Sequence, residues 1–134
     1  MRTITNHIVE GDSANHQLKI VVVDAPGAGG ANHQYNIDWY DGLKRDGPGA
    51  DQQQQRAECF IGFQNGPIKE FGVNGVTQEA LLAIIIDRLR SFQAGPFSCQ
   101  DNQLALSCCE SALGLLQKRT RDRMARGVEG KTEK

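Results

Sequence analysis

The stretch TQEALLAIIIDRLRSFQAGP, residues 77–96, decides the fold of the second half of the chain. Thr77 is a residue type that caps helix N-termini, Glu79 favours the first-turn dipole, and no Gly or Pro follows until Gly95. Its apolar residues recur at helical spacing, with one stripe of Leu82, Ile85, Leu89 and Phe92 that is widened by Leu81, Ile84 and Ile86. The stretch therefore predicts a helix that begins after Thr77 and is stopped by Gly95-Pro96.

A second helix is predicted after that break. Ser98 and Asp101, three residues apart, resemble a capping box with Asp in place of the usual Glu. Two neighbouring apolar stripes follow, one of Leu104, Cys108, Ala112 and Leu115 and one of Ala105, Cys109, Leu113 and Leu116. We expect this helix to end near Arg126-Gly127, because glycine readily takes the left-handed conformation of a helix terminator.

The first half of the chain is typical of strands. Four short runs rich in β-branched or alternating apolar residues predict them, at residues 3–9, 17–24, 33–40 and 59–63. Turn-like residues link the runs, and a long polar stretch at 41–56 contains Gln52–Gln55, which we expect to form a mobile loop or a hairpin tip. No helical pattern separates the runs, so an antiparallel meander is favoured over a βαβ unit.

The predicted fold class is thus α+β: an N-terminal antiparallel β-sheet meander followed by two C-terminal α-helices that form an αα-hairpin. A chain of 134 residues fits a single domain. Its predicted parts are a sheet at 1–64, a loop at 65–76, the helical hairpin at 77–127 and a tail at 128–134. Both helices are apolar on more than one side, which favours an oligomer in which helices of two subunits pack together. A monomer with a thick core is the alternative.

The overall composition favours a cytosolic protein without a metal or another cofactor. The net charge of −1 gives the whole molecule no bias toward nucleic acid or membrane. The first residues lack the apolar run of a signal peptide, and the longest apolar stretch, 80–86, is too short to span a bilayer. The four cysteines, which we expect to be reduced thiols, lack the spacing of a zinc site: Cys59, Cys99, Cys108 and Cys109.

No catalytic constellation is visible in the sequence. The glycine-rich loop at 24–32 lacks the Lys-Ser/Thr of a phosphate-binding loop, and no helix is predicted to start there, so we interpret it as structural or flexible. His7, His16 and His33 lie on the early strands and turns, without a nucleophile elbow or a metal-ligand pair nearby. We therefore assign no catalytic residue and do not expect an enzyme.

Two segments have the composition of a binding site for a small polar anion. The loop at 63–75 contains two Asn-Gly turns, each suited to positive φ, and can present amides and a ring to a ligand. Residues 118–134 carry seven basic and three acidic residues, and Arg119, Arg123 and Arg126 share one helix face suited to phosphate oxygens. A solvated helix end and a nucleic-acid contact remain alternative interpretations of that face.

From Phe63 to Gly130 the chain resembles the first Thoeris anti-defence family of phage proteins, to which an anti-CBASS sponge family is related. The motifs that carry the resemblance are FQNGPIKE at 63–70, GVNG at 72–75, GPF at 95–97 with Asn102, and KRTxxRxxRGVEG at 118–130. The resemblance implies a sponge that binds cyclic nucleotide immune signals, notably glycocyclic ADP-ribose and in some members CBASS cyclic di- or trinucleotides, without cleaving them. It also implies a homodimer or hexamer in the cytoplasm of the infected bacterial host, without membrane or specific nucleic-acid partners.

The resemblance also implies roles for individual residues. Phe97 and Asn102 would contact the adenine and ribose side of the signal, and Arg119 would contact its diphosphate. Arg123 belongs to the same group of ligand-binding residues, and Asn74 would shape the pocket from its loop. Arg126, Gly127 and Gly130 would form a second, trinucleotide site. A signal-degrading enzyme and a small nucleic-acid-binding protein that uses the C-terminal basic helix are the alternatives.

Overall fold

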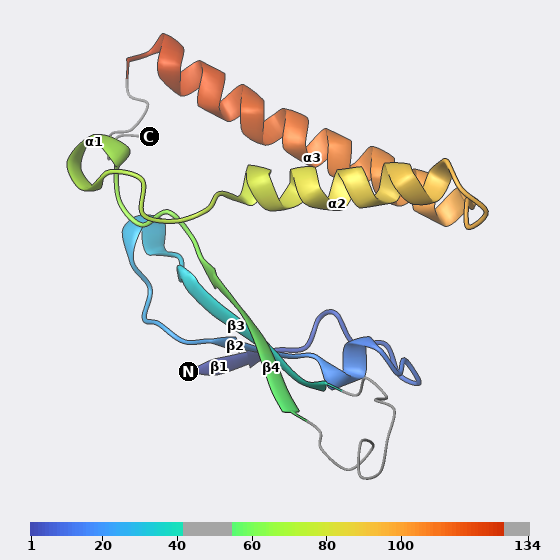
Figure 1. Ribbon diagram of the computed structural model, residues 1–134. Coiled ribbons are helices and arrows are strands. Elements are labelled where there is room, and N and C mark those ends of the chain that lie inside the picture. Colours follow the sequence, from blue (N-terminus) through green and yellow to red (C-terminus); the bar gives the residue numbers. More distant parts are fainter. Residues whose placement is uncertain (42–54, 128–134) are drawn as a thin grey trace. The chain divides into compact units, whose positions relative to one another are not determined.

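The computed structural model describes residues 1–41 and 55–127 of the chain. The chain divides into two compact units, Met1–Gly62 and Phe63–Lys134 (Figure 1). The first unit holds four strands and two short 3-10 turns: β1 (Arg2–Ile4), η1 (Asn15–Gln17), β2 (Lys19–Val22), η2 (Ala28–Gly30), β3 (Gln34–Asp41) and β4 (Gln55–Gly62). The second unit holds three helices: α1 (Ile68–Phe71), α2 (Gln78–Gln93) and α3 (Gln100–Ala125).

The four strands form one sheet in the order β1-β2-β3-β4, and every neighbouring pair is antiparallel. This confirms the predicted α+β class with an N-terminal meander followed by C-terminal helices. One face of the sheet is apolar, because Ile20 lies opposite Ile37 and Val22 lies opposite Tyr35. Val22 is 1% exposed and is the most deeply buried large side chain of this unit.

The first two strands are shorter than the sequence predicts. The strand predicted at 3–9 ends at Ile4, because the chain turns there and Ile8 N donates to Thr5 O at 3.0 Å. The strand predicted from residue 17 begins at Lys19, after η1. The carboxylate of Asp12 orders the approach to η1 by accepting from Asn15 Nδ2 at 2.6 Å and from the backbone of residues 14 and 15. These bonds lower the pKa of Asp12.

The last strand is longer than predicted. It begins at Gln55 instead of residue 59 and pairs without interruption along β3, from Asp41↔Gln55 to Gln34↔Gly62. An ion pair of 3.2 Å between Arg56 Nη2 and Asp38 Oδ2 joins the two strands at this extension. The polar composition of 55–58 therefore marks an exposed strand instead of a loop, whereas residues 52–54 lie outside the described part of the chain.

The glycine-rich loop at 24–32 has a structural role, as predicted. The carboxylate of Asp24 accepts from the backbone N of His33 at 2.9 Å and from that of Gln34 at 3.2 Å, and Asn32 Nδ2 donates to Asp24 O at 2.7 Å. Partial burial raises the pKa of Asp24, but the backbone hydrogen bonds outweigh it, so the pKa lies below the ordinary value of 3.8. The loop thus leads into β3, and the ionised carboxylate of Asp24 binds the backbone at the point where it does so.

The two long helices begin at capping side chains. Thr77 caps α2 as predicted, since its Oγ1 accepts from Ala80 N at 3.1 Å, an interaction worth about 1 kcal/mol. The predicted cap of α3, Ser98, is wrong: Cys99 is the N-cap, and its Sγ accepts from Asn102 N at 3.4 Å. The prediction failed because thiols are poor hydrogen-bond acceptors and are not expected at this position. Helix α3 ends as predicted, with Gly127 at φ 71°.

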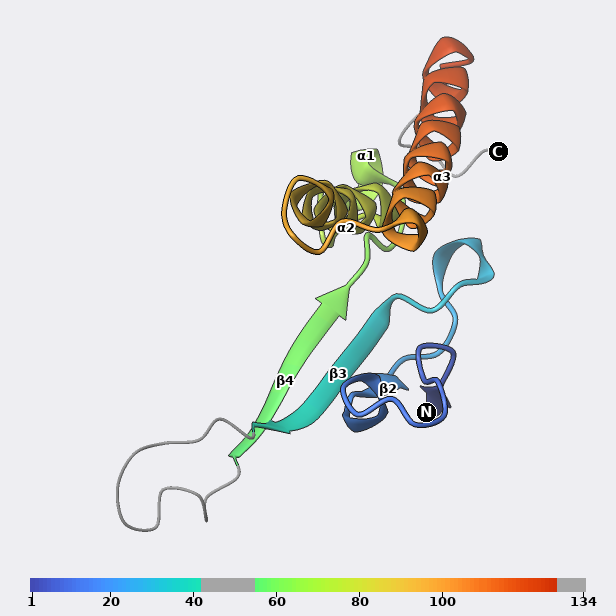
Figure 2. The same cartoon turned by 90° about the vertical axis from the view of Figure 1, so that its right-hand side faces the viewer.

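Helices α2 and α3 pack against each other as a hairpin near their junction, and the last turns of α3 run away from α2 (Figures 1 and 2). Within the predicted stripe on α2, Leu82 and Leu89 are half-buried. The most buried residue is Ile86, at 3% exposed, which was predicted only to widen the stripe, whereas Ile85 is 44% exposed. On α3 the buried residue is Leu106, at 6% exposed, which belongs to neither predicted stripe. An ion pair between Arg90 Nη2 and Glu110 Oε2 at 2.8 Å joins the two helices at their surface.

Asp24→Ala should lower the thermal stability of the first unit, because the backbone N–H groups of His33 and Gln34 lose their acceptor. The folded protein holds this pKa below its unfolded value, so the carboxylate stabilises the fold above pH 3.8, and this stabilisation is lost as the pH falls through the folded pKa. Circular-dichroism melts between pH 2 and pH 7 should therefore converge for the wild type and the variant at the acid end. Glu10→Ala, which removes an exposed carboxylate of the same unit, is the control and should behave as the wild type.

Candidate functional site

The loop between β4 and α2 is fastened by two amide side chains. Asn74 Oδ1 accepts from Asn65 N and Asn74 Nδ2 donates to Asn65 O, both at 2.8 Å. Gln64 Oε1 accepts from Asn74 N at 2.9 Å, while Gln64 Nε2 donates to Gly72 O at 2.8 Å and to Gly66 O at 3.2 Å. We call this pair of side chains the amide clasp. Asn74 therefore uses both of its polar side-chain atoms to hold the two ends of its loop together. These are the atoms that could otherwise contact a ligand.

The glycines of this loop serve two different purposes. Gly66 has φ 88°, as predicted for the first Asn-Gly turn, and the Phe71 ring lies so close that a Cβ at Gly66 would be 2.5 Å from Phe71 Cδ2. The prediction of a positive φ at the second Asn-Gly turn is wrong, because the φ of Gly75 is not positive. Gly75 is needed for close approach instead: Phe63 and Val76 form a parallel bridge, and a Cβ at Gly75 would lie 2.4 Å from Phe63 C.

The junction between α2 and α3 brings Phe97 and Asn102 together. Asn102 Nδ2 donates to Phe97 O at 3.4 Å, and the Phe97 ring is 73% exposed. Gln93 ties the junction to the end of α2, because its Oε1 accepts from Cys99 N at 3.0 Å and its Nε2 donates to Gln103 Oε1 at 3.4 Å. The junction thus presents an aromatic ring on a turn whose backbone is held from both helices.

The predicted cations lie on the last turns of α3. Arg119 and Arg126 are exposed and Arg123 is half-buried. Lys118 Nζ donates to Asp122 Oδ2 at 2.7 Å, and this bond and the charge of Lys118 lower the pKa of Asp122. The helix end therefore carries an ionised acid among its cations and keeps a cationic excess. Of the predicted second site, the structure describes Arg126 and Gly127, whereas Gly130 lies outside the described residues.

The structure does not bring the two groups of predicted residues together within one chain. Asn102 lies in the first turn of α3 and Arg119 lies seventeen positions later, which at 1.5 Å per residue is roughly 25 Å along the helix. One small ligand cannot reach both ends of that distance. Phe97 with Asn102 and Arg119 with Arg123 are thus separate groups, placed toward opposite ends of α3.

None of the predicted ligand-binding residues lines the hollow on the sheet. That hollow has a volume of about 340 Å³ and is lined by residues of the first unit, among them Thr3, Lys19, Val21 and Asp38. Within residues 1–41 and 55–127, no three His, Cys, Asp or Glu side chains are grouped so that they could hold a metal ion. In the same ranges, no helix combines the length and the hydropathy of a membrane span.

Sequence reasoning missed three side chains that organise the candidate site, Gln64, Gln93 and Cys99. Glutamine has no strong positional signal, because its reach lets it bond to many backbone atoms. Gln64 precedes an Asn-Gly turn and Gln93 precedes a helix stop, and both are places where the backbone leaves polar groups unpaired. A search for long amides beside such breaks would have found both of them.

Asn74→Ala should loosen the loop at 63–76 and leave the helical hairpin folded. The substitution removes the bonds to both polar backbone atoms of Asn65, so the Asn65 N–H should exchange with solvent at least about tenfold faster, as expected for the loss of roughly 1.4 kcal/mol of protection. Amide hydrogen exchange followed by NMR measures this directly. Gln103→Ala, whose side chain bonds at the opposite end of the hairpin, should leave the Asn65 exchange rate unchanged.

Two comparisons with known proteins match this part of the chain. A family model described as the Acb2/Tad1 hairpin domain matches residues 55–121, from the start of β4 into the last turns of α3. Thoeris anti-defense 1 of Bacillus phage SBSphiJ7 is 49% identical over 74 residues, which are 55% of this chain and 52% of that protein. The chain thus matches about half the length of this curated relative. Because the family model covers half of the chain and includes the amide clasp, the hairpin junction and Arg119, the chain belongs to the Acb2/Tad1 family.

Proposed function

We propose that this protein is a phage anti-defence protein that binds cyclic nucleotide immune signals such as glycocyclic ADP-ribose and holds them without cleaving them. The observation that carries the proposal is the 49% identity to a protein named for Thoeris anti-defence, over a segment that belongs to the same family. The protein would act in the cytoplasm of the infected bacterial host, where such signals are made.

The chemistry of the two separate groups suits such a ligand. A cyclic nucleotide carries a flat base and an anionic phosphate group. Phe97 offers an exposed ring for the base, and the Asn102 amide lies beside it. Arg119 and Arg123 offer guanidinium groups, which bind phosphate oxygens in pairs. Arg126 and Gly127, with Gly130, are the proposed contacts of a second site for cyclic trinucleotides.

The apolar surface of the hairpin supports assembly of two copies. After α2 and α3 have packed on each other, large apolar side chains stay exposed along both helices: Ile84 58%, Ile85 44%, Leu104 55% and Leu115 68%. A second copy could bury these side chains and gain about 25 cal/mol for each Å² removed from water. We therefore propose a homo-oligomer, a dimer or a hexamer, whose copies are held together by their helices.

An antiparallel arrangement of two hairpins would also complete the binding site. It would place the Phe97 end of one α3 near the Arg119 end of the other, so that one ligand touches both groups although they lie roughly 25 Å apart in each chain. In this arrangement the sponge works only as an oligomer, with two equivalent sites related by the two-fold axis. The amide clasp would hold the neighbouring loop in a fixed shape.

The protein should capture glycocyclic ADP-ribose and release it intact. Calorimetry at physiological salt should show binding, and chromatography of the supernatant after heat denaturation should show the unchanged cyclic compound. Linear product that accumulates beyond the amount of protein would establish the degrading enzyme instead. Tighter binding to duplex DNA than to the signal, falling steeply with salt, would establish the nucleic-acid-binding protein.

Arg119→Ala should weaken signal binding while leaving the oligomer intact. Each charge-assisted bond that the guanidinium makes to phosphate is worth roughly 1.5–3 kcal/mol, so affinity should fall by on the order of tenfold to a hundredfold or more. Calorimetry measures the affinity, and light scattering measures the mass. Arg121→Ala is the matched control, because a residue two positions along a helix points away from the Arg119 face and should not affect binding.

A substitution in the exposed apolar surface completes this test. Leu115→Ser should reduce the mass seen by light scattering and should also reduce signal binding, because the site is shared between copies. Unchanged affinity in Arg119→Ala would show that Arg119 is only a solvated helix-end cation. Unchanged affinity in a monomeric Leu115→Ser variant would show that one chain holds the whole site.

A further inference from the structure

Strand β4 ends the sheet with a long and regular edge. It spans Gln55–Gly62 and pairs with β3 on one side, and no other strand of the described residues lies on its outer side. Its register against β3 is continuous, without a bulge, and the strand contains no proline. Such an edge offers a row of backbone N–H and C=O groups to another strand. Bulges, prolines and charged side chains are the usual means of preventing this pairing, and of these β4 carries only charges, those of Arg56 and Glu58.

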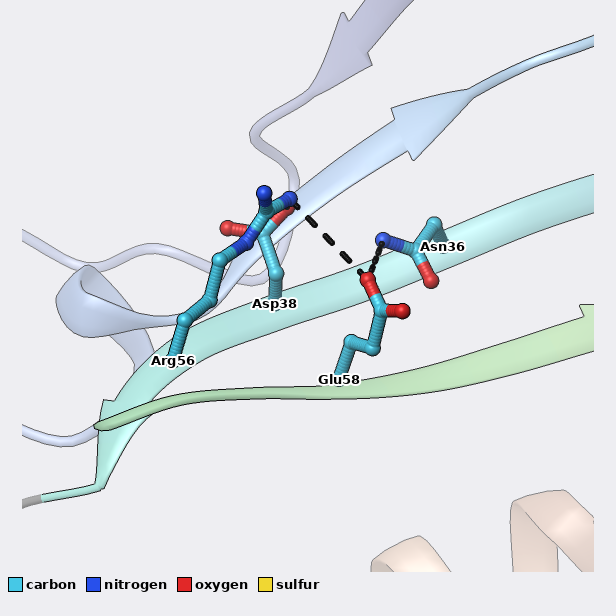
Figure 3. A network of polar contacts seen from close by, with 4 residues as sticks. All are labelled: Asn36, Asp38, Arg56 and Glu58. Atoms are coloured by element: carbon cyan, nitrogen blue, oxygen red, sulfur yellow. Dashed lines mark hydrogen bonds and ion pairs between the residues drawn. The ribbon is translucent and has the colours of Figure 1, made fainter.

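The charges on this edge are arranged in a way that a second copy could match. Arg56 and Glu58 project from the same face of β4, where Figure 3 shows them beside Asn36 and Asp38. Arg56 binds Asp38 at 3.2 Å, but its contact with Glu58 is 4.0 Å long. The side chains of Arg56 and Glu58 are 60% and 62% exposed. Both groups thus keep most of their surface available to a further partner.

We propose that β4 pairs with β4 of a second copy, antiparallel and with the two-fold axis at Ala57. In this register Arg56 lies opposite Glu58 of the partner subunit, and Glu58 lies opposite the partner's Arg56. Opposite charges that face each other across antiparallel strands stabilise the pairing. The small side chain at Ala57 lets the two strands approach at the axis. The pairing joins two four-stranded sheets into one continuous sheet.

The charges select this register over its neighbours. A two-fold axis perpendicular to the sheet pairs residues of the same face, so it must pass through a single position of the strand. An axis at Glu58 would place the two Glu58 carboxylates opposite each other, which is repulsive. An axis at Cys59 would place Glu58 opposite the partner's Phe60 and would form no ion pair. Among these three positions, only the axis at Ala57 pairs both charges with opposite charges.

This contact is distinct from the helical assembly proposed above, because it lies in the sheet unit. Strand β4 is the one described strand within the segment that matches the family, since that segment begins at residue 55. A subunit with two different two-fold contacts can join more than one partner and build assemblies larger than a dimer. The sheet contact requires no ligand, so its test is independent of signal binding.

Cysteine cross-linking tests the proposed register. The proposed axis places residue 55 opposite Cys59 of the partner subunit, within the Cα separation of 4.5–5.5 Å typical of facing strands and suitable for a disulfide. The background carries Cys99→Ser, Cys108→Ser and Cys109→Ala, which leave Cys59 as the native thiol; serine is itself a good N-cap for α3. In this background Gln55→Cys should form a disulfide-linked dimer under mild oxidation, seen on a non-reducing gel and by mass spectrometry of the linked peptides.

Matched variants make the result specific. Gln55→Cys with Cys59→Ser should give at least about tenfold less linked dimer, because position 55 then has no thiol opposite it within disulfide reach. Ala57→Cys with Cys59→Ser should link across the axis. Adding Glu58→Arg to the Gln55→Cys protein should reduce the linked fraction, and adding Arg56→Glu as well should restore it, because the charges are then exchanged and still opposite.

Three results would overturn the proposal. One is the absence of linked dimer in both Gln55→Cys and Ala57→Cys while circular dichroism shows a folded sheet. Another is equal linking of Gln55→Cys with and without Cys59, which would indicate random collision. The third is a native Cys59–Cys59 link in the unaltered strand, which would place the axis at Cys59.

Discussion

The contact between α2 and α3 can bury the apolar side chains on only one side of each helix. The exposed surface of the second unit is a consequence of that limit. A two-helix hairpin has a single contact face, which Ile86 and Leu106 occupy at 3% and 6% exposed. Both helices carry more apolar residues than this face can hold, and Leu115 is 68% exposed as a result. The hairpin also sets Phe97 and Arg119 far apart. A protein built in this way has an apolar surface and two separate groups of the proposed binding residues, all of which a second copy could use.

The sequence predicted the order and class of the elements, because those depend on periodicity and on strong local signals. Thr77 was correctly predicted to cap a helix and Gly127 to end one, because a threonine before an apolar run and a glycine after it are strong signals of helix ends. The choice between Ile85 and Ile86 could not be made from the sequence. Three isoleucines in a row, 84–86, satisfy several stripes equally well, and the angle at which α3 crosses decides which one is buried.

The sheet was predicted less accurately at its ends. Residues 55–58 form the start of β4 although all but Ala57 are polar. They pair with β3, the polar ones are exposed, and an exposed strand needs few apolar residues. The strand predicted at 3–9 stops at Ile4 because of a backbone turn that β-branched residues do not exclude. Within the candidate site, the sequence pointed to Asn74 and to the junction of Phe97 and Asn102. It did not show that Gln64 and Cys99 hold these segments in place, because side-chain to backbone bonds depend on where the chain returns in space.

The amide clasp has a consequence for the speed of recognition. Gln64 and Asn74 order the loop at 63–76 during folding, so the loss of conformational entropy in that segment precedes any encounter with a ligand. A loop that has to close over its ligand slows association, whereas an already ordered one leaves diffusion and orientation as the limiting steps. Under the proposed function the protein competes with a receptor for a newly made messenger, and the time needed to intercept each molecule then matters as much as the strength of the complex. A loop that is ordered before the messenger appears is suited to fast capture.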